Sequence, residues 1–192
     1  MRDILFDNNR AWAEAKQAVD PDFFPTLSKG QRPHYLWIGC SDSRVAPNLL
    51  MDKDLGEVFV QRNIANQVLS DDDNTMAVLE YAVNELEVSE IIVCGHYACG
   101  GVNATLQNKL KDESSPIYRW LSPLSRLAER YQDYLNQLAP EKRADALAEL
   151  NLAYQISNLL ERDIIAQRWR QNHNLLIRGL MFEFASGRLL DM

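Results

Sequence analysis

Two short apolar runs, each closed by a glycine and followed at once by a cysteine or a histidine, constrain the fold of this chain most. Residues 34–38 lead through Gly39 into Cys40, and residues 91–94 lead through Gly95 into His96. Both runs have the length and composition of buried strands, and helical patterns lie between and after them. Apolar strands that alternate with helices indicate an α/β fold with a mainly parallel central sheet flanked by helices.

The remaining elements follow from the spacing of apolar residues, because alternation favours a strand and a spacing of three or four residues favours a helix. Residues 57–61 alternate and favour a strand, and residues 175–184 predict a last strand that continues into a terminal hairpin at a Ser-Gly turn. The acidic residues 71–73 are expected to cap a helix at its positive end. The expected helices cover residues 6–19, 76–86, 101–110 and, with interruptions near Pro123 and Pro140, 117–171.

Length and composition favour one globular domain over residues 1–192. The chain is 46% hydrophobic and 24% charged, and its net charge of −7 argues against a nucleic-acid-binding surface. No apolar run reaches the ~20 residues of a membrane span, and residues 1–10 mix Arg, Asp and Asn where a secretory signal would be apolar. Three cysteines do not predict a disulfide framework. We expect a cytoplasmic protein that binds neither nucleic acid nor a membrane.

Cys40, His96 and Cys99 offer two thiolates and one imidazole, a ligand set that suits Zn²⁺. Three protein ligands leave one coordination position open, as in catalytic rather than structural zinc sites. Gly100 and Gly101 would let the backbone approach metal and substrate closely. Both cysteines must stay reduced to bind metal, which fits a reducing compartment. We predict one Zn²⁺ per chain.

Simpler interpretations compete for single residues. A lone histidine is more often a hydrogen-bonding surface or core residue, and we interpret His34 and His173 in this way. Cys94, inside a strand, is interpreted as a small apolar core residue. A zinc finger would take its ligands as two close pairs, whereas Cys40 is single and distant. A thioredoxin-like pair would need Cys-x-x-Cys, which is absent.

Asp42 and Arg44 are not needed to hold a metal. Alone they could form a surface ion pair of little energetic worth. Beside Zn²⁺, however, a carboxylate must either coordinate the ion or be held away, and Arg44 can hold it through a bidentate pair. Asp42 in that position could accept a hydrogen bond from a zinc-bound hydroxide. We therefore interpret these two residues as catalytic.

The runs Cys40-x-Asp42-x-Arg44 and Gly95-His96-x-x-Cys99-Gly100-Gly101 resemble the two defining motifs of the β-class carbonic anhydrases. Residues 56–66 and 80–83 also match, and the likeness is dense from residue 9 to 106 and thinner beyond. The resemblance implies a zinc enzyme that interconverts CO₂ and water with bicarbonate and a proton. It makes Cys40, His96 and Cys99 the zinc ligands, and Asp42 with Arg44 the catalytic dyad.

A substrate pocket and an assembly are also implied by the resemblance. Gln31 matches the family's substrate-orienting glutamine, and Phe59, Ile64 and Tyr81 match its apolar CO₂ pocket. Members of the family are dimers or higher assemblies, such as tetramers, whose N-terminal helix lies across the partner. We therefore expect the helix over residues 6–19 to pack on a partner subunit.

Regulation is a further implication. Some members hold bicarbonate in a regulatory pocket built from a tryptophan, an arginine and a tyrosine, and the bound anion favours a closed state with the aspartate as fourth zinc ligand. Trp37 and Arg62 match two of these positions, but Phe182 stands at the third. We expect Asp42 to be the fourth ligand in any closed state, and bicarbonate to inhibit weakly.

Two alternatives remain at this point. A hydrolase of COS or CS₂ on the same scaffold would use the same zinc chemistry, and only the shape of its pocket would differ. A zinc-stabilised binding protein without catalysis would be expected to have a fourth strong ligand and to lack Asp42 or Arg44. Neither feature is present in this sequence.

Overall fold

The computed structural model describes residues 3–107, 109, 111–171 and 174–192. The chain forms two compact units, Met1–Arg32 and Pro33–Met192. The predicted end of a helix at Leu110 and the interpretation of His173 fall outside the described residues. Within the described ranges, no helix has the length and apolar character needed to cross a membrane.

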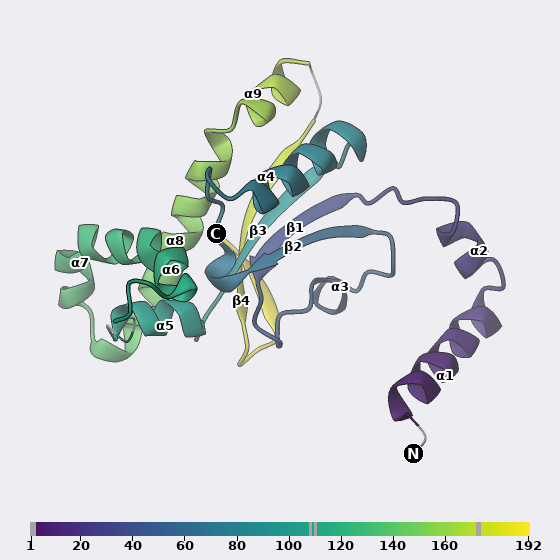
Figure 1. Ribbon diagram of the computed structural model, residues 1–192, viewed down its shortest axis with the longest axis horizontal. Helices are drawn as coiled ribbons and strands as arrows, with labels where there is room; N and C mark the ends of the chain where they lie inside the picture. Colours follow the sequence, from purple (N-terminus) through teal and green to yellow (C-terminus); the bar gives the residue numbers. More distant parts are fainter. Residues whose placement is uncertain (1–2, 108, 110, 172–173) are drawn as a thin grey trace. The chain divides into compact units, whose positions relative to one another are not determined.

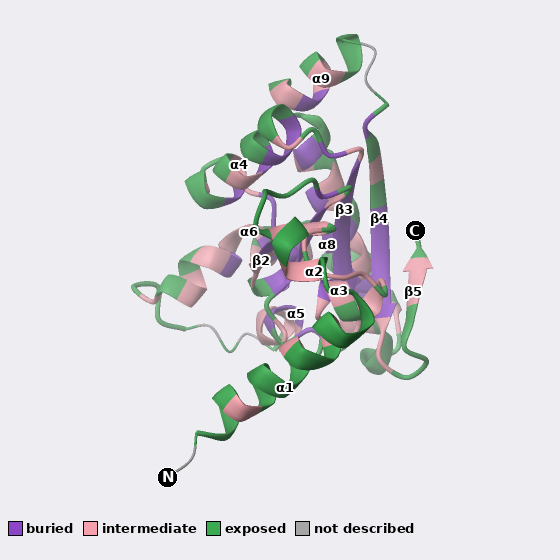
Figure 2. Ribbon diagram, turned by 90° about the vertical axis from the view of Figure 1, so that its right-hand side faces the viewer, coloured by how far each residue is buried: buried purple, intermediate pink, exposed green. Residues whose placement is uncertain are grey.

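The N-terminal unit contains the predicted helix, α1 (Ile4–Val19), and a short helix, α2 (Phe23–Leu27). The side chain of Asp3 caps α1 by accepting a hydrogen bond from the backbone N–H of Leu5, and the helix ends before Pro21. None of its residues is buried within the chain, so α1 is mostly green in Figure 2.

The second unit is built on a five-stranded sheet in the order β2-β1-β3-β4-β5. The first four strands in the chain pair in parallel, and β5 is antiparallel to β4, which confirms the mainly parallel sheet and the terminal hairpin (Figure 1). β1 and β3 each run past their glycine, so Cys40 and His96 are the last residues of strands. The strands are β1 (Tyr35–Cys40), β2 (Val58–Asn63), β3 (Glu90–His96), β4 (Leu176–Glu183) and β5 (Arg188–Asp191).

The helices largely follow the predicted pattern. Asp72 caps α4 through a hydrogen bond from the backbone N–H of Asn74, and α4 continues into a π-helical turn. The expected break at Pro140 is present as a 3₁₀ turn. The helical elements are α3 (Pro47–Leu50), η1 (Ile64–Asn66), α4 (Asp73–Glu80), η2 (Tyr81–Glu85), α5 (Gly100–Leu106), α6 (Pro116–Arg130), α7 (Gln132–Gln137), η3 (Pro140–Lys142), α8 (Arg143–Leu160) and α9 (Asp163–Arg170).

The expected interruption near Pro123 was wrong, because α6 runs through this residue. Proline lacks the N–H that would bond the carbonyl oxygen of Arg119, four residues earlier. The hydroxyl of Ser122 donates a hydrogen bond to that oxygen instead, at 3.0 Å. The helix therefore keeps the carbonyl satisfied without a break.

Helices cover the two faces of the sheet unequally. The larger core joins side chains of β1 and β3, such as Leu36 and Ile91, to buried residues of α4, α5, α6 and α8. A smaller cluster on the other face contains Trp37, Cys94 and Phe182, with part of α3 and β5 against it. Because β1 and β3 pair in parallel, their carboxyl ends lie side by side, so the site stands on neighbouring buried strands.

Candidate metal centre

Cys40 reaches the site from the end of β1. A side chain on Gly39 would overlap the indole nitrogen of Trp37, so this position requires glycine. Arg62, opposite Gly39 on β2, donates from Nε to the carbonyl oxygen of Cys40 and from Nη2 to that of Asp42, at 2.9 and 2.5 Å. These bonds fix the backbone that follows β1. Arg62 thus has a clear structural role in addition to the anion-binding role expected of it.

His96 and Cys99 come from one tight loop between β3 and α5. Ala98, between them, has φ of 53°, in the left-handed region that favours glycine. This conformation turns the chain back so that both side chains face the same space. Cys99 precedes α5, and the backbone N–H groups of Gly101 and Val102 face its sulfur. The local backbone is thus shaped to converge the two ligands.

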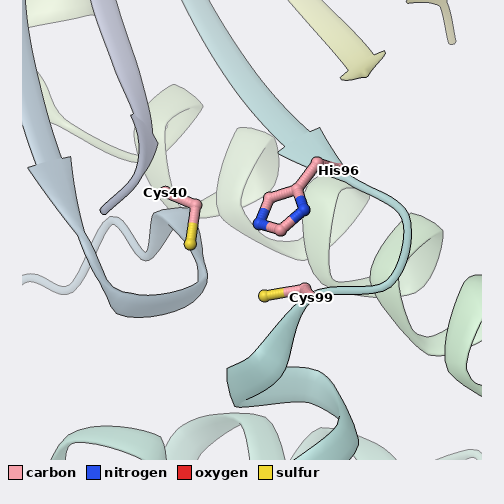
Figure 3. A group of neighbouring side chains, drawn as sticks. All are labelled: Cys40, His96 and Cys99. Carbon is pink, nitrogen blue, oxygen red and sulfur yellow. The ribbon is translucent and has the colours of Figure 1, made fainter. Parts of the chain in front are cut away.

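The three predicted ligands meet. The ligand atoms of Cys40, His96 and Cys99 lie within 4.8 Å of one another, and all three residues are buried. Their side chains point toward one another in Figure 3, from the end of β1, the end of β3 and the loop that follows β3. The structure thus assembles one buried cluster of three soft or borderline ligands.

The donor set fits a zinc ion. The ring of His96 bonds through Nδ1 to the carbonyl oxygen of Tyr97, at 2.9 Å, which leaves Nε2 unprotonated and able to bind a metal. Nε2 is buried and has no hydrogen-bond partner among the described residues. A buried polar atom without a partner is costly, and a metal ion in the cluster would satisfy it.

The two sulfur atoms behave as a pair. A hydrogen bond from Cys99 lowers the pKa of Cys40, although burial opposes this shift. The pKa of Cys99 is raised, first because its thiol donates to Cys40 and then because of burial. Cys40 is therefore the more acidic of the two thiols, and a bound dication would compensate the negative charges of both thiolates.

Asp42 is held by Arg44 as the sequence predicts. Arg44 donates from Nε to Oδ1 at 2.9 Å and from Nη2 to Oδ2 at 2.7 Å, and its backbone N–H also donates to Oδ1. These hydrogen bonds keep the pKa of Asp42 well below its usual range. Both carboxylate oxygens face the guanidinium group, so Asp42 is ionised and held in one orientation.

The residues expected to form the substrate pocket are only partly gathered. The rings of Phe59 and Tyr81 lie 5.8 Å apart. Ile64 lies by Gly101, where an added Cβ would approach Ile64 Cγ2 to 3.0 Å, and Gly100 faces open space. A separate cavity of about 480 Å³ beside Ile64 is lined by Ser41, Gln61, Asn63, Ile64, Asp72, Asn74, Pro116, Ile117 and Trp120. Gln31 is exposed and belongs to the N-terminal unit, whereas the predicted metal ligands belong to the unit Pro33–Met192.

The structure also places the residues that were interpreted outside the metal cluster or as part of an anion pocket. Trp37 and Phe182 share the smaller core cluster, and the buried indole nitrogen of Trp37 lacks a hydrogen-bond partner among the described residues. Cys94 is fully buried within β3, as predicted, and burial raises the pKa of its thiol. His34 is an exposed residue whose ring bonds the hydroxyl of Ser89.

A buried polar network behind the site was not predicted. The amide nitrogen of Asn151, on α8, donates to the carbonyl oxygen of Ala65 at 2.9 Å, and Ala65 is held at φ of 63°. The backbone N–H of Ala65 in turn faces the sulfur of Cys40. Asn151 and Gln155 are fully or nearly fully buried and bond each other. Their four-residue spacing on an otherwise apolar helix face was the signal that could have found them.

Comparison with known proteins identifies the family. The carbonic anhydrase family model matches residues 35–189. A carbonic anhydrase of Emericella nidulans is 40% identical over 190 residues, covering 99% of this chain and 82% of that protein. One of Saccharomyces cerevisiae is 34% identical, covering 98% and 87%. The chain belongs to the carbonic anhydrase family.

Solved structures place it in the β class. A tetrameric β-carbonic anhydrase of Sordaria macrospora superimposes with a TM-score of 0.93 at 36% identity, covering 98% of this chain and 95% of that one. The β-carbonic anhydrase of Coccomyxa, solved with acetazolamide, gives 0.94 at 34% identity, covering 100% and 87%. The fold and the family resemblance predicted from the sequence are therefore confirmed.

Proposed function

We propose that this chain catalyses the reversible hydration of CO₂ to bicarbonate and a proton, with one Zn²⁺ held by Cys40, His96 and Cys99. The observation that carries the proposal is the pairing of two arrangements: three ligand atoms that converge within 4.8 Å, and a nearby carboxylate fully engaged by Arg44. When bound, zinc acts as a Lewis acid and lowers the pKa of a water molecule toward neutrality. Membership of the carbonic anhydrase family supports the same reaction.

Asp42 and Arg44 are the proposed catalytic residues. Asp42 is ionised, so it can accept a hydrogen bond from the attacking water. This bond would fix the direction in which the lone pair of the water oxygen points. Arg44 donates hydrogen bonds to both carboxylate oxygens of Asp42, which keeps Asp42 from becoming a fourth metal ligand. In a closed state, Asp42 would leave Arg44 and take that ligand position.

The proposed substrate site is apolar, as suits a small molecule without charge. Phe59, Ile64 and Tyr81 supply apolar surface, and the exposed fractions of Ile64 (41%) and Tyr81 (48%) leave their side chains available to a ligand or a second subunit. Gly100 leaves the backbone open to close approach, whereas Gly101, which packs against Ile64, is assigned to the substrate site from the family resemblance alone. We assign Gln31 the role of orienting substrate, on the basis of the family motif.

We propose that the chain acts as one catalytic domain over residues 1–192 and associates as a dimer or tetramer. The related enzyme of Sordaria macrospora is tetrameric. Helix α1 buries none of its residues within the chain, and Ile4, Leu5 and Phe6 are largely exposed, which supports packing on a partner subunit. Three free cysteines support a reducing, cytoplasmic compartment.

Stopped-flow measurement of CO₂ hydration on zinc-loaded protein tests the function. We expect rapid hydration in the wild type and only the uncatalysed rate in Cys40→Ser, which serves as a matched control. COS and CS₂ are to be tested in parallel. Rapid turnover of COS or CS₂ without CO₂ hydration would favour the alternative hydrolase, and no turnover of any substrate by fully zinc-loaded protein would refute catalysis.

A further inference from the structure

Phe184 is an aromatic residue that the expected site does not include, although it lies against it. It follows β4 directly and is half-buried in the smaller core cluster. The guanidinium carbon of Arg44 lies 3.9 Å from the centre of its ring. A planar cation at this distance over an aromatic face is attracted electrostatically by the ring. Phe184 therefore contacts the arginine that holds Asp42.

The same ring also contacts a proposed zinc ligand. The rings of Phe184 and His96 are 5.3 Å apart at 67°, in an edge-to-face arrangement. Phe184 also meets Phe182, a residue of β4, in a second edge-to-face contact with the ring centres 5.1 Å apart. One ring thus contacts both the metal cluster and the dyad. It comes from the segment after β4, which contributes no residue to the cluster or to the dyad.

Arg44 needs such support because of its position. Its side chain is 53% exposed, and exposed ion pairs are weak since water competes and long side chains move. The bidentate contact with Asp42 fixes one edge of the guanidinium group, whereas Phe184 covers one of its faces. Edge and face together restrict the group to one plane.

We propose that Phe184 is a positioning residue: by stacking on Arg44 and touching His96, it keeps the guanidinium group in the plane that holds Asp42 away from the metal. This inference rests on the proposed function. Without the ring, Arg44 samples other rotamers and Asp42 is released toward the metal more often. Catalysis should fall although every ligand and both members of the dyad are still present.

The test compares Phe184→Leu with Phe184→Tyr in zinc-loaded protein. We expect zinc content to stay at one ion per chain in both, and kcat/KM to fall roughly fivefold to thirtyfold in Phe184→Leu. The loss should lie in kcat, because the substitution displaces Asp42 and leaves the apolar substrate pocket unaltered. Phe184→Tyr keeps an aromatic face and should retain most of the activity. Leu189→Ala, which removes an apolar contact from the same cluster, is the control for simple loosening of the core.

A readout that does not depend on activity is the NMR signal of the Arg44 Nε–H group. In the wild type, the ring current of Phe184 should shift this proton upfield, and the hydrogen bond to Asp42 should slow its exchange. Phe184→Leu should lose both effects, and Leu189→Ala should keep them. Unchanged kcat and unchanged Arg44 exchange in Phe184→Leu would overturn the proposal. Wild-type protein that is inactive with zinc would instead refute the proposed function.

Discussion

The metal ligands and the catalytic dyad lie side by side but are held in different ways. His96 and Cys99 are 1% and 3% exposed, and they emerge from a buried strand and the loop that follows it. Arg44 is 53% exposed at its side chain, on a loop held to Arg62 through backbone carbonyl oxygens. The ligands are thus positioned by the core, whereas the dyad is positioned by a few polar and aromatic contacts.

This difference predicts different sensitivities. A buried ligand cluster should be insensitive to changes at the surface but should fail completely when one ligand is replaced. A dyad on an exposed loop should respond to its own contacts, because each of them is weak. Substitutions in the two regions should therefore separate metal binding from catalysis.

The largest effect is expected from Cys99→Ser. A hydroxyl replaces a thiolate, so the site loses both negative charge and softness, and zinc affinity should fall by more than the roughly 10- to 100-fold that an outer hydrogen-bond partner is worth. Metal analysis after dialysis measures this directly. Cys94→Ala is the matched control, because Cys94 is buried in β3 as an apolar residue and should leave zinc content unchanged. Full zinc in Cys99→Ser would contradict the ligand assignment.

A smaller effect, confined to catalysis, is expected from Asp42→Asn. The amide of asparagine has one acceptor oxygen where the carboxylate has two, and its nitrogen can only donate, so the hydration rate should fall by about 100-fold or more while zinc stays bound. Arg44→Ala should also reduce the rate, because it releases Asp42 toward the metal. The pair of measurements is zinc content and kcat on the same samples. Normal turnover by Arg44→Ala would show that the dyad is misassigned.

The smallest effect concerns regulation by bicarbonate. Phe182 is buried beside Trp37 and has no hydroxyl to offer an anion, and Arg62 already donates to two backbone carbonyl oxygens. One hydrogen bond to a charged ligand is worth about 1.5–3 kcal/mol, or roughly 10- to 100-fold in affinity. We expect weak inhibition by bicarbonate in the wild type and stronger inhibition in Phe182→Tyr. Without bicarbonate, the two proteins should hydrate CO₂ at similar rates. Strong inhibition in the wild type that the hydroxyl does not change would contradict this account.

The sequence predicted the parts of the site that depend on residue type and on the ends of strands. Cys40 and His96 follow apolar runs, and parallel strands bring their carboxyl ends together, so their convergence with Cys99 could be expected. The pairing of Asp42 with Arg44 followed from their charges and spacing. These inferences used local chemistry and one general rule of topology.

The supporting contacts could not be predicted in the same way. Asn151 and Phe184 reach the site from elements far along the chain, and their roles depend on tertiary packing. The helix through Pro123 depended on one hydroxyl that replaced a missing donor. A sequence pattern shows which residues can do chemistry, but three-dimensional contacts decide which of them hold the reactive groups in place.

X-ray absorption at the zinc edge of the purified protein tests the central claim most directly. The account predicts a four-coordinate ion with two sulfur neighbours from Cys40 and Cys99, one nitrogen neighbour from His96, and one oxygen from water. In Arg44→Ala the sulfur and nitrogen count should stay the same while the oxygen neighbour becomes the carboxylate of Asp42. A wild-type spectrum with a single sulfur neighbour, or with three or four, would contradict the proposed centre.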